Sequence, residues 1–223
     1  MLKVEGLDVR IGGVQVLRSA TLELPRGTMA GLVGRNGAGK TTLMRAVMGL
    51  ARPSSGRVAI DGRDVTERAP HLRAKMGVGY MPEDRRLVPE LTVQENVLLP
   101  AWANGIPDAG ARLAWIYALM PEVEGFSARR ALQLSGGQQK LVALARALMN
   151  GRHLMLLDEP FEGIAPALAH RLGEVLRTLK AEGPAVLVSE SDYRHCAGLV
   201  DKVFVIERGV VSEHAAQVPK ASP

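Results

Sequence analysis

The fold is decided by one glycine-rich stretch, Gly34-Arg35-Asn36-Gly37-Ala38-Gly39-Lys40-Thr41-Thr42. Its first eight residues fit the pattern G-x-x-x-x-G-K-[ST], in which glycines let successive backbone N–H groups converge on phosphate oxygens. Lys40 supplies a positive charge for the β- and γ-phosphates of a nucleotide, and the Thr41 hydroxyl supplies a ligand for Mg²⁺. The stretch therefore predicts a Mg-ATP site that runs from Gly34 to Thr42.

The segments on either side of this turn provide the context that the pattern requires. Residues 28–33 are apolar and predict a short buried strand, and residues 40–50 carry apolar side chains at helical spacing. A phosphate bound at the turn would face the positive amino end of that helix. A chance match to the pattern is therefore the weaker interpretation.

The rest of the chain alternates between predicted strands and helices. Residues 3–9 and 16–24 alternate in polarity and predict β-structure, and residues 53–56 are expected to stop the first helix. Further strands are predicted at 57–60, 77–80, 153–157, 185–189, 202–207 and 210–212, and helices at 136–149 and 167–180, before an irregular tail from about His214. This order predicts a mostly parallel α/β sheet, in which ligands bind beyond the carboxyl ends of the strands.

Residues 82–133 differ in character, because strand patterns disappear and helices are predicted at 93–103 and 109–119. We interpret them as a helical insert within one domain that spans 1–223. Leu87, Val88 and Leu91 are apolar residues in its charged first loop. They predict either a docking surface for a partner or contacts within the insert's own core.

The composition favours a folded protein, with 47% apolar and 23% charged residues among 223. The net charge of +5 is scattered, so we expect a solvated surface and no nucleic-acid partner. Cys196 is the single cysteine, which excludes an internal disulfide. No apolar run reaches the ~18 residues of a membrane span, and the first ten residues do not resemble a signal peptide. We therefore expect a cytosolic protein that reaches a membrane only through partners.

Two carboxylates follow the predicted strand at 153–157. Asp158 is placed to hold Mg²⁺, and Glu159 is placed to polarise the water that attacks the γ-phosphate. Phosphoryl transfer depends mainly on positioning and charge stabilisation, so these two groups together with Lys40 suffice as a catalytic set. An apolar strand that ends in Asp-Glu is common by itself. The phosphate-binding turn upstream favours the interpretation that these two carboxylates are functional.

A third motif, Leu134-Ser135-Gly136-Gly137-Gln138-Gln139, opens the helix predicted at 136–149. Ser135 lies at the N-cap position, and the amino end of a helix favours an anion. An ordinary capped helix explains this motif equally well when it is taken alone.

Taken together, the motifs GRNGAGKTT (34–42), LSGGQQ (134–139) and LMLLDEP (154–160) resemble the ATP-binding subunits of ABC transporters. The resemblance covers essentially the whole chain. It implies a P-loop NTPase core with a mostly parallel sheet, an N-terminal antiparallel β-subdomain and an inserted α-helical subdomain. It also implies a dimer, in which Ser135, Gly136, Gly137 and Gln138 cap the ATP of the partner ATPase subunit, so that a monomer is nearly inactive.

A finer resemblance rests on GYMPE (79–83), PELTVQEN (89–96) and DEPFEGIAP (158–166). These segments are similar to the ATPases of branched-chain amino acid importers and of their relatives for urea, amides and aromatic acids. The resemblance implies a second ATPase subunit, identical or different, two transmembrane permeases and a periplasmic substrate-binding protein. It places the chain at the cytoplasmic face of the inner membrane, as a peripheral subunit.

Three positions depart from the family's pattern. Ile11 stands where many members stack an aromatic residue on adenine, which removes a stacking contribution of about 1 kcal/mol. Glu83 replaces a glutamine that reaches Mg²⁺, and a carboxylate oxygen can also bind this metal. Ser191 replaces the histidine that contacts the γ-phosphate, while His195 lies one turn further on and is expected at the surface.

These departures leave two hypotheses open besides a transport motor. A repair or translation ATPase of the same family usually carries long insertions or two fused cassettes, for which 223 residues leave no room. A nucleotide-binding subunit with impaired hydrolysis fits the departures, whereas Lys40, Asp158 and Glu159 favour an active ATPase. The transported substrate depends on the permease and the binding protein.

Overall fold

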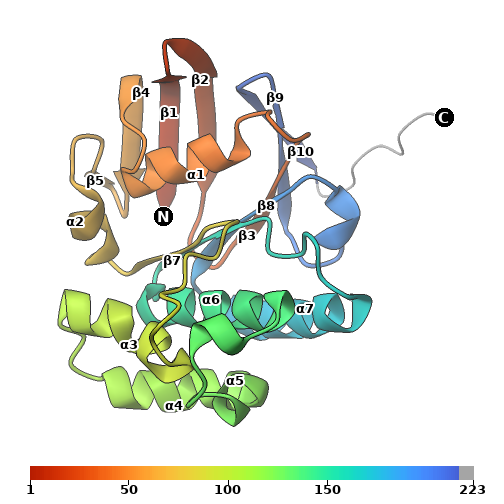
Figure 1. Ribbon diagram of the computed structural model, residues 1–223. Coiled ribbons are helices and arrows are strands. Elements are labelled where there is room, and N and C mark those ends of the chain that lie inside the picture. Colours follow the sequence, from red (N-terminus) through yellow and green to blue (C-terminus); the bar gives the residue numbers. More distant parts are fainter. Residues whose placement is uncertain (216–223) are drawn as a thin grey trace.

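The computed structural model describes residues 1–215, and the predicted irregular tail lies mostly outside them. The main sheet has six strands (Figure 1). Their order is β10 (Val210–Ala215), β9 (Lys202–Glu207), β3 (Met29–Val33), β8 (Ala185–Glu190), β7 (Leu154–Asp158) and β6 (Val78–Met81). All neighbouring pairs are parallel except β10 with β9. The predicted mostly parallel sheet is therefore confirmed.

Two hydrophobic cores lie on the two faces of this sheet. Successive side chains of a strand point to opposite faces. On one face, Leu154, Leu156, Ala185 and Leu187 share a core with α1 (Lys40–Met48). On the other, Met155, Leu157, Val186 and Val188 share a core with α6 (Gly136–Asn150) and α7 (Pro166–Ala181). The same two layers of helices are visible in Figure 1.

A four-stranded sheet covers α1 on the side away from the main sheet, as Figure 1 shows. Its order is β2 (Val14–Leu24), β1 (Leu2–Ile11), β4 (Pro53–Ile60) and β5 (Arg63–Asp64), and all of its pairs are antiparallel. The N-terminal antiparallel β-subdomain is thus confirmed. Its strands bury the outer face of α1, which carries Lys40 and Thr41 at its first turn.

Residues 53–56 follow the end of α1, as expected, and they also form the first half of β4, which therefore begins before the strand predicted at 57–60. Pro, Ser and Gly favour a turn locally, but here β1 supplies the pairing partner from a distant part of the chain. Asp8 anchors the pairing, since its carboxylate accepts a hydrogen bond from the Ser55 hydroxyl at 2.7 Å. Gly56 has φ +86°, and a Cβ there would lie 2.3 Å from the carbonyl oxygen of Gly6. Only glycine fits this crossing of two strands.

Residues 82–133 contain no named strand among the described residues, and their helices lie beyond α6 in Figure 1. They form α3 (Val93–Asn104), α4 (Ala109–Leu119), α5 (Pro121–Gly125) and the short 3₁₀ helix η1 (Ala131–Gln133). Leu87 packs against the core that these helices share with α6, whereas Val88 is 37% exposed. The bounds 82 and 133 of the insert remain a prediction.

None of the helices within residues 1–215 has both the length and the apolar character that a membrane crossing requires.

A buried arginine holds the carboxyl end of α1. Arg73, in α2 (Pro70–Ala74), is 1% exposed. Its guanidinium donates hydrogen bonds to the carbonyl oxygens of Ala46 and Val47, both at 2.8 Å, and to those of Thr66 and Arg68 at 2.9 and 3.0 Å. Burial lowers the pKa of Arg73. This side chain therefore satisfies carbonyl groups that a helix end leaves without partners.

We expect Arg73→Met to lower the free energy of unfolding by about 3 kcal/mol, because it leaves several buried carbonyl groups without a donor. Chemical denaturation measures the change. Arg52→Met is a suitable control, since Arg52 is 84% exposed in its ion pair with Glu67, and its effect should stay below about 0.5 kcal/mol. A loss below about 1 kcal/mol for Arg73→Met would contradict the structural role.

Candidate nucleotide-binding site

The predicted phosphate-binding turn connects the carboxyl end of β3 to the amino end of α1. Gly39 has φ +115°, which a residue with a side chain rarely adopts, and it provides no side-chain cap for α1. A Cβ on Gly34 would lie 2.3 Å from the carbonyl oxygen of Ile206. The backbone of the turn thus requires glycine at both positions. The amino end of α1 thus carries no side-chain cap and could face a bound anion, as the sequence predicts.

Parallel register brings the ends of three strands together. Val33 of β3 pairs with Glu190 of β8, and Ser189 of β8 pairs with Asp158 of β7. The groups that follow these strands therefore meet at one edge of the sheet. Clefts of about 490 and 330 Å³ open at this edge.

Lys40 and Glu159 are in direct contact within this edge. Their side chains are 5% and 3% exposed, and Lys40 Nζ lies 3.0 Å from Glu159 Oε1. The same ammonium donates hydrogen bonds to the carbonyl oxygens of Gly34 at 2.5 Å and Arg35 at 3.2 Å. The structure therefore brings together the two residues that the sequence predicted to act on the γ-phosphate.

Glu159 is held in an unusual backbone conformation. Its φ is +50°, which residues other than glycine seldom adopt. Its N–H donates to the Ser189 carbonyl at 3.1 Å, and its Oε2 accepts from the Ser191 N–H at 3.1 Å. Ser191 thus reaches Glu159 through its backbone. Such local strain often accompanies a functional position.

The two carboxylate oxygens of Asp158 differ in their hydrogen bonding. Its Oδ1 accepts a hydrogen bond from the Ser189 hydroxyl at 2.6 Å. Its Oδ2 is buried and has no hydrogen-bond partner within residues 1–215. Burial raises the pKa of Asp158, and the nearby hydroxyls of Ser189 and Thr41 oppose that rise. A spare carboxylate oxygen beside a threonine hydroxyl is a donor set that fits Mg²⁺, which is usually held by few protein ligands and by substrate phosphates.

Glu83 follows β6 and lies in the same region. It lines the larger cleft with Thr41 and Asp158, and the smaller one with Lys40 and Glu159. Burial raises the pKa of Glu83, and the neighbouring carboxylates of Glu162, Asp158 and Glu159 raise it further. A cation in this cluster would relieve that repulsion.

Two of the predicted contacts lie away from these clefts. Ile11 is 49% exposed at the end of β1 and lines neither cleft, whereas Val16 lines the smaller one. The Ser135–Gln138 segment lies at the amino end of α6 and also lines neither. Ser135 and Gln138 form a capping box, with hydrogen bonds of 3.3 and 3.0 Å between side chain and backbone N–H.

The sequence-based interpretation missed a buried carboxylate, Glu190. Its Oε1 accepts from the Phe161 N–H at 3.0 Å, its Oε2 lies 2.9 Å from His195 Nδ1, and its carbonyl accepts from the Gly34 N–H at 3.1 Å. The expectation that His195 lies at the surface is confirmed, since its side chain is 42% exposed, and its ring also reaches the buried Glu190 carboxylate. The detectable signal was a glutamate at the end of an apolar strand, the same signal that identified Asp158.

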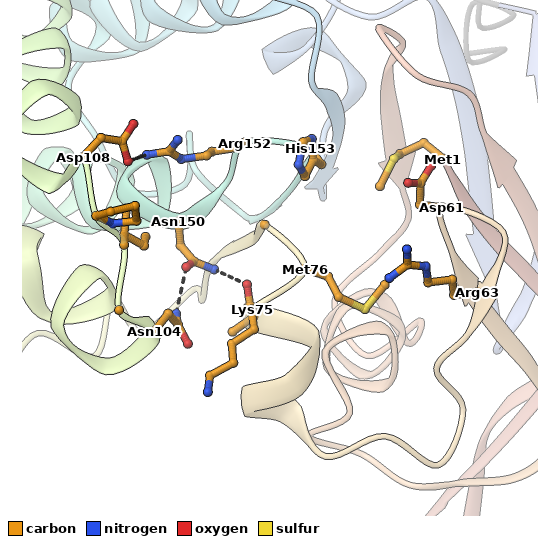
Figure 2. A pocket seen from close by; sticks show the side chains of 15 residues that line it. Met1, Asp61, Arg63, Lys75, Met76, Asn104, Asp108, Asn150, Arg152 and His153 are labelled. Carbon is orange, nitrogen blue, oxygen red and sulfur yellow. Dashed lines mark hydrogen bonds and ion pairs between the residues drawn. The ribbon is translucent and has the colours of Figure 1, made fainter.

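Another cleft, of about 640 Å³, lies at the opposite edge of the sheet, where Gly77 and His153 precede β6 and β7. Figure 2 shows the side chains that line it. Its polar groups pair with one another. Asn104 Nδ2 donates to Asn150 Oδ1 at 2.8 Å, Asn150 Nδ2 donates to the Ala74 carbonyl at 2.9 Å, and Arg152 pairs with Asp108 at 2.5 Å. This cleft therefore joins α3, α6 and the start of β6 and lies apart from the phosphate-binding turn.

Comparison with known proteins identifies the family. The family model described as ABC transporter matches residues 17–162. The chain belongs to the ABC transporter ATP-binding family. Members of this family bind nucleotide and hydrolyse ATP to drive transport, and this ABC ATPase carries the motifs that do so.

Named relatives of this ABC ATPase differ in what they transport. A "Probable ABC transporter ATP-binding protein" of Azorhizobium caulinodans is 36% identical over 92% of this chain and 74% of its own length. The "High-affinity branched-chain amino acid transport ATP-binding protein BraG" of Pseudomonas aeruginosa is 30% identical over 96% and 92%. The "Lipopolysaccharide export system ATP-binding protein LptB" of Acidithiobacillus ferridurans is 33% identical over 88% and 82%.

Solved structures confirm the fold of this ABC ATPase. The ADP conformation of MJ1267, an ATP-binding cassette of an ABC transporter, superposes with a TM-score of 0.84 at 27% identity, over 96% of this chain and 91% of that one. A dimeric structure of the bacterial cassette MJ0796 gives 0.86 at 25% identity, over 98% and 100%. The P-loop core with an inserted helical subdomain is thereby shown.

The stability of this ABC ATPase should depend on pH through Glu190. Burial raises the pKa of Glu190 from its ordinary 4.5 to about 7, against the opposing effects of His195 and the Phe161 N–H. Between these pH values the folded protein keeps a proton that the unfolded chain releases, so the free energy of unfolding falls as pH rises. We expect Glu190→Gln to make this decline shallower by about 1 kcal/mol per pH unit, measured by denaturation between pH 4.5 and 7. Equal slopes for both proteins would refute it.

Proposed function

We propose that this chain is the ATP-hydrolysing motor subunit of an importer for branched-chain amino acids or related small polar compounds. Sequence identity alone does not choose between import and export, since BraG and LptB are similarly related. Two of the named relatives, BraG and the probable LivF of Archaeoglobus fulgidus, are branched-chain amino acid transport ATP-binding proteins. The segments at 79–83, 89–96 and 158–166 also resemble the amino acid importers.

The contact between Lys40 and Glu159, beside Asp158, is the observation that best supports an active ATPase. Backbone N–H groups of Gly34 to Thr42 would hold the phosphates, and Lys40 would neutralise charge on the γ-phosphate. Bound Mg²⁺ would add Lewis-acid stabilisation of the phosphates. Asp158 Oδ2 and the Thr41 hydroxyl would hold this ion, and Glu83 would supply a further oxygen.

Glu159 would orient the attacking water and accept its proton. Two donors hold this carboxylate at the γ-phosphate edge of the site, the Lys40 ammonium and the Ser191 N–H. Ser191 therefore acts mainly through its backbone, and its short side chain would contribute little. Ile11 would contact adenine as an aliphatic residue.

Completion of the site would require a second ATPase subunit, identical or different. Ser135, Gly136, Gly137 and Gln138 line neither cleft at this chain's own phosphate-binding turn, which leaves them free to cap a partner's ATP. The dimeric state of MJ0796 supports this assembly. Two permeases and a periplasmic binding protein would complete an importer at the inner membrane.

The alternative is a nucleotide-binding subunit with impaired hydrolysis beside an active ATPase. The departures at Glu83 and Ser191 favour it. The placement of Lys40, Asp158 and Glu159 argues against it, since Lys40 contacts Glu159 and Asp158 directly precedes Glu159 at the end of β7.

We expect Glu159→Gln to reduce ATP turnover of the assembled transporter at least about 100-fold while ATP still binds, because the amide cannot accept a proton. Steady-state ATPase assays and equilibrium binding of a fluorescent ATP analogue measure the two effects. Turnover near the wild-type rate would remove Glu159 from the catalytic role and favour the impaired-subunit alternative.

The transport role can be tested by affinity purification of the chain with its permeases, followed by reconstitution into lipid vesicles. With its substrate-binding protein present, we expect leucine, isoleucine or valine to stimulate ATPase activity at least about threefold and to enter the vesicles. A complex that ignores amino acids and small amides, or that extracts a lipid-linked saccharide, would overturn the import proposal.

A further inference from the structure

Lys140 is a buried lysine that joins two catalytic segments of the chain. It lies in the second turn of α6, close behind the Ser135–Gln138 segment, and is 6% exposed. Its ammonium donates a hydrogen bond to the Glu159 carbonyl oxygen at 2.8 Å and another to the Glu162 carbonyl oxygen. The Leu134–Gln139 motif at the start of α6 is called the signature below, and α6 the signature helix. The Lys140 side chain therefore spans from the signature helix to the loop that begins with Glu159.

The two carbonyl groups belong to one tight turn. The Glu162 N–H donates to the Glu159 carbonyl at 3.3 Å, and Glu159 has the left-handed φ noted above. An ammonium group offers only donors, and two converging carbonyl oxygens are its natural partners. Lys140 thus clamps the turn that fixes the direction of the Glu159 side chain.

A second buried group holds the same turn from another element. Glu190 of β8 accepts a hydrogen bond from the Phe161 N–H at 3.0 Å, and its own carbonyl is bonded to the Gly34 N–H. Burial lowers the pKa of Lys140, and the carboxylates of Glu190, Glu162 and Glu159 oppose this effect. A buried ammonium is costly unless it is paired, so this geometry is tightly specified.

We propose that Lys140 is a positioning residue that couples the signature helix to this chain's own Glu159. The inference rests on the proposed function, in which the signature serves the partner's ATP and Glu159 serves the ATP at Gly34–Thr42. Because α6 is a continuous helix of 15 residues, a shift of its amino end toward the partner also moves Lys140. The two carbonyl groups then move with Lys140, and the water-orienting carboxylate is set at its working position.

The coupling gives one chain a physical link between two ATP sites. Contact of Ser135 with the partner's nucleotide is transmitted through α6 and Lys140 to the turn at Glu159–Glu162. Hydrolysis at this chain's own phosphate-binding turn therefore depends on closure at the other site. The link consists of the two hydrogen bonds that Lys140 donates, so a substitution of Lys140 can remove it.

The test compares Lys140→Met and Lys140→Arg in the assembled transporter. Methionine keeps most of the length of the side chain and removes its donors, whereas arginine keeps both charge and donors. We expect Lys140→Met to lower kcat about tenfold with the Kd for ATP unchanged within about twofold, and Lys140→Arg to recover part of kcat. A kcat of Lys140→Met within twofold of wild type, or a loss of ATP affinity that matches the loss of rate, would overturn the proposal.

A matched control separates positioning from stability. Lys180 also donates to a carbonyl and a carboxylate, those of Leu199 and Asp201, but belongs to α7 outside the nucleotide clefts. Lys180→Met should lower Tm and leave kcat within about twofold. The wild-type rate tests the proposed function by itself, whereas the ratio of Lys140→Met to wild type tests only Lys140. A Lys180→Met loss of kcat equal to that of Lys140→Met would show that the effect is general destabilisation.

A double-mutant cycle tests the link to the signature helix. Ser135→Ala weakens the contact to the partner's ATP, and Lys140→Met removes the transmission. If Lys140 carries the coupling, the double variant loses at least about threefold less kcat than the product of the single losses. Losses that multiply would show that the two residues act independently, and the coupling would be rejected.

Discussion

Parallel pairing of β3, β8 and β7 in a fixed register is the constraint on which the rest of the site depends. It brings Val33, the Ser189–Glu190 pair and Asp158 to one level at the carboxyl edge of the sheet. The residues that follow each strand end, Gly34 after β3, Glu159 after β7 and Ser191 after β8, therefore meet at the proposed nucleotide site. A slip of one residue in β7 would turn Asp158 from the site to the opposite face of the sheet.

The same edge concentrates charge in a buried region. Asp158, Glu159 and Glu190 are all nearly inaccessible to water, and Lys40 and Lys140 are the buried cations beside them. Repulsion and burial raise the pKa values of Asp158 and Glu190. A bound triphosphate would draw Lys40 toward its phosphates, and a divalent cation would then be a suitable counter-charge for the carboxylates. This cluster of carboxylates therefore supports the proposal of a Mg-ATP site.

The two buried lysines, Lys40 and Lys140, hold different parts of Glu159. Lys40 holds the Glu159 carboxylate and the phosphate-binding turn, whereas Lys140 holds the backbone of the same glutamate from α6. Under the proposed coupling, hydrolysis and subunit closure are linked at Glu159. Such a link would let a site made of two half-sites avoid hydrolysis before both halves are in place.

Features that depend on local geometry could be predicted from the order of residues alone. The phosphate-binding turn needs glycine, lysine and threonine at adjacent positions, so it is visible in the order of residues from Gly34 to Thr42. Asp158 and Glu159 follow a continuous apolar strand and could be found in the same way. The contacts between segments far apart in the chain could be identified only in the tertiary structure. Pairing with β1 turned residues 53–56 into a strand, and close packing of β8 and α6 against the turn at Glu159 brought in Glu190, His195 and Lys140. No local sequence pattern predicts these contacts, because each of these side chains contacts a segment that is distant in the chain and is brought close only by folding.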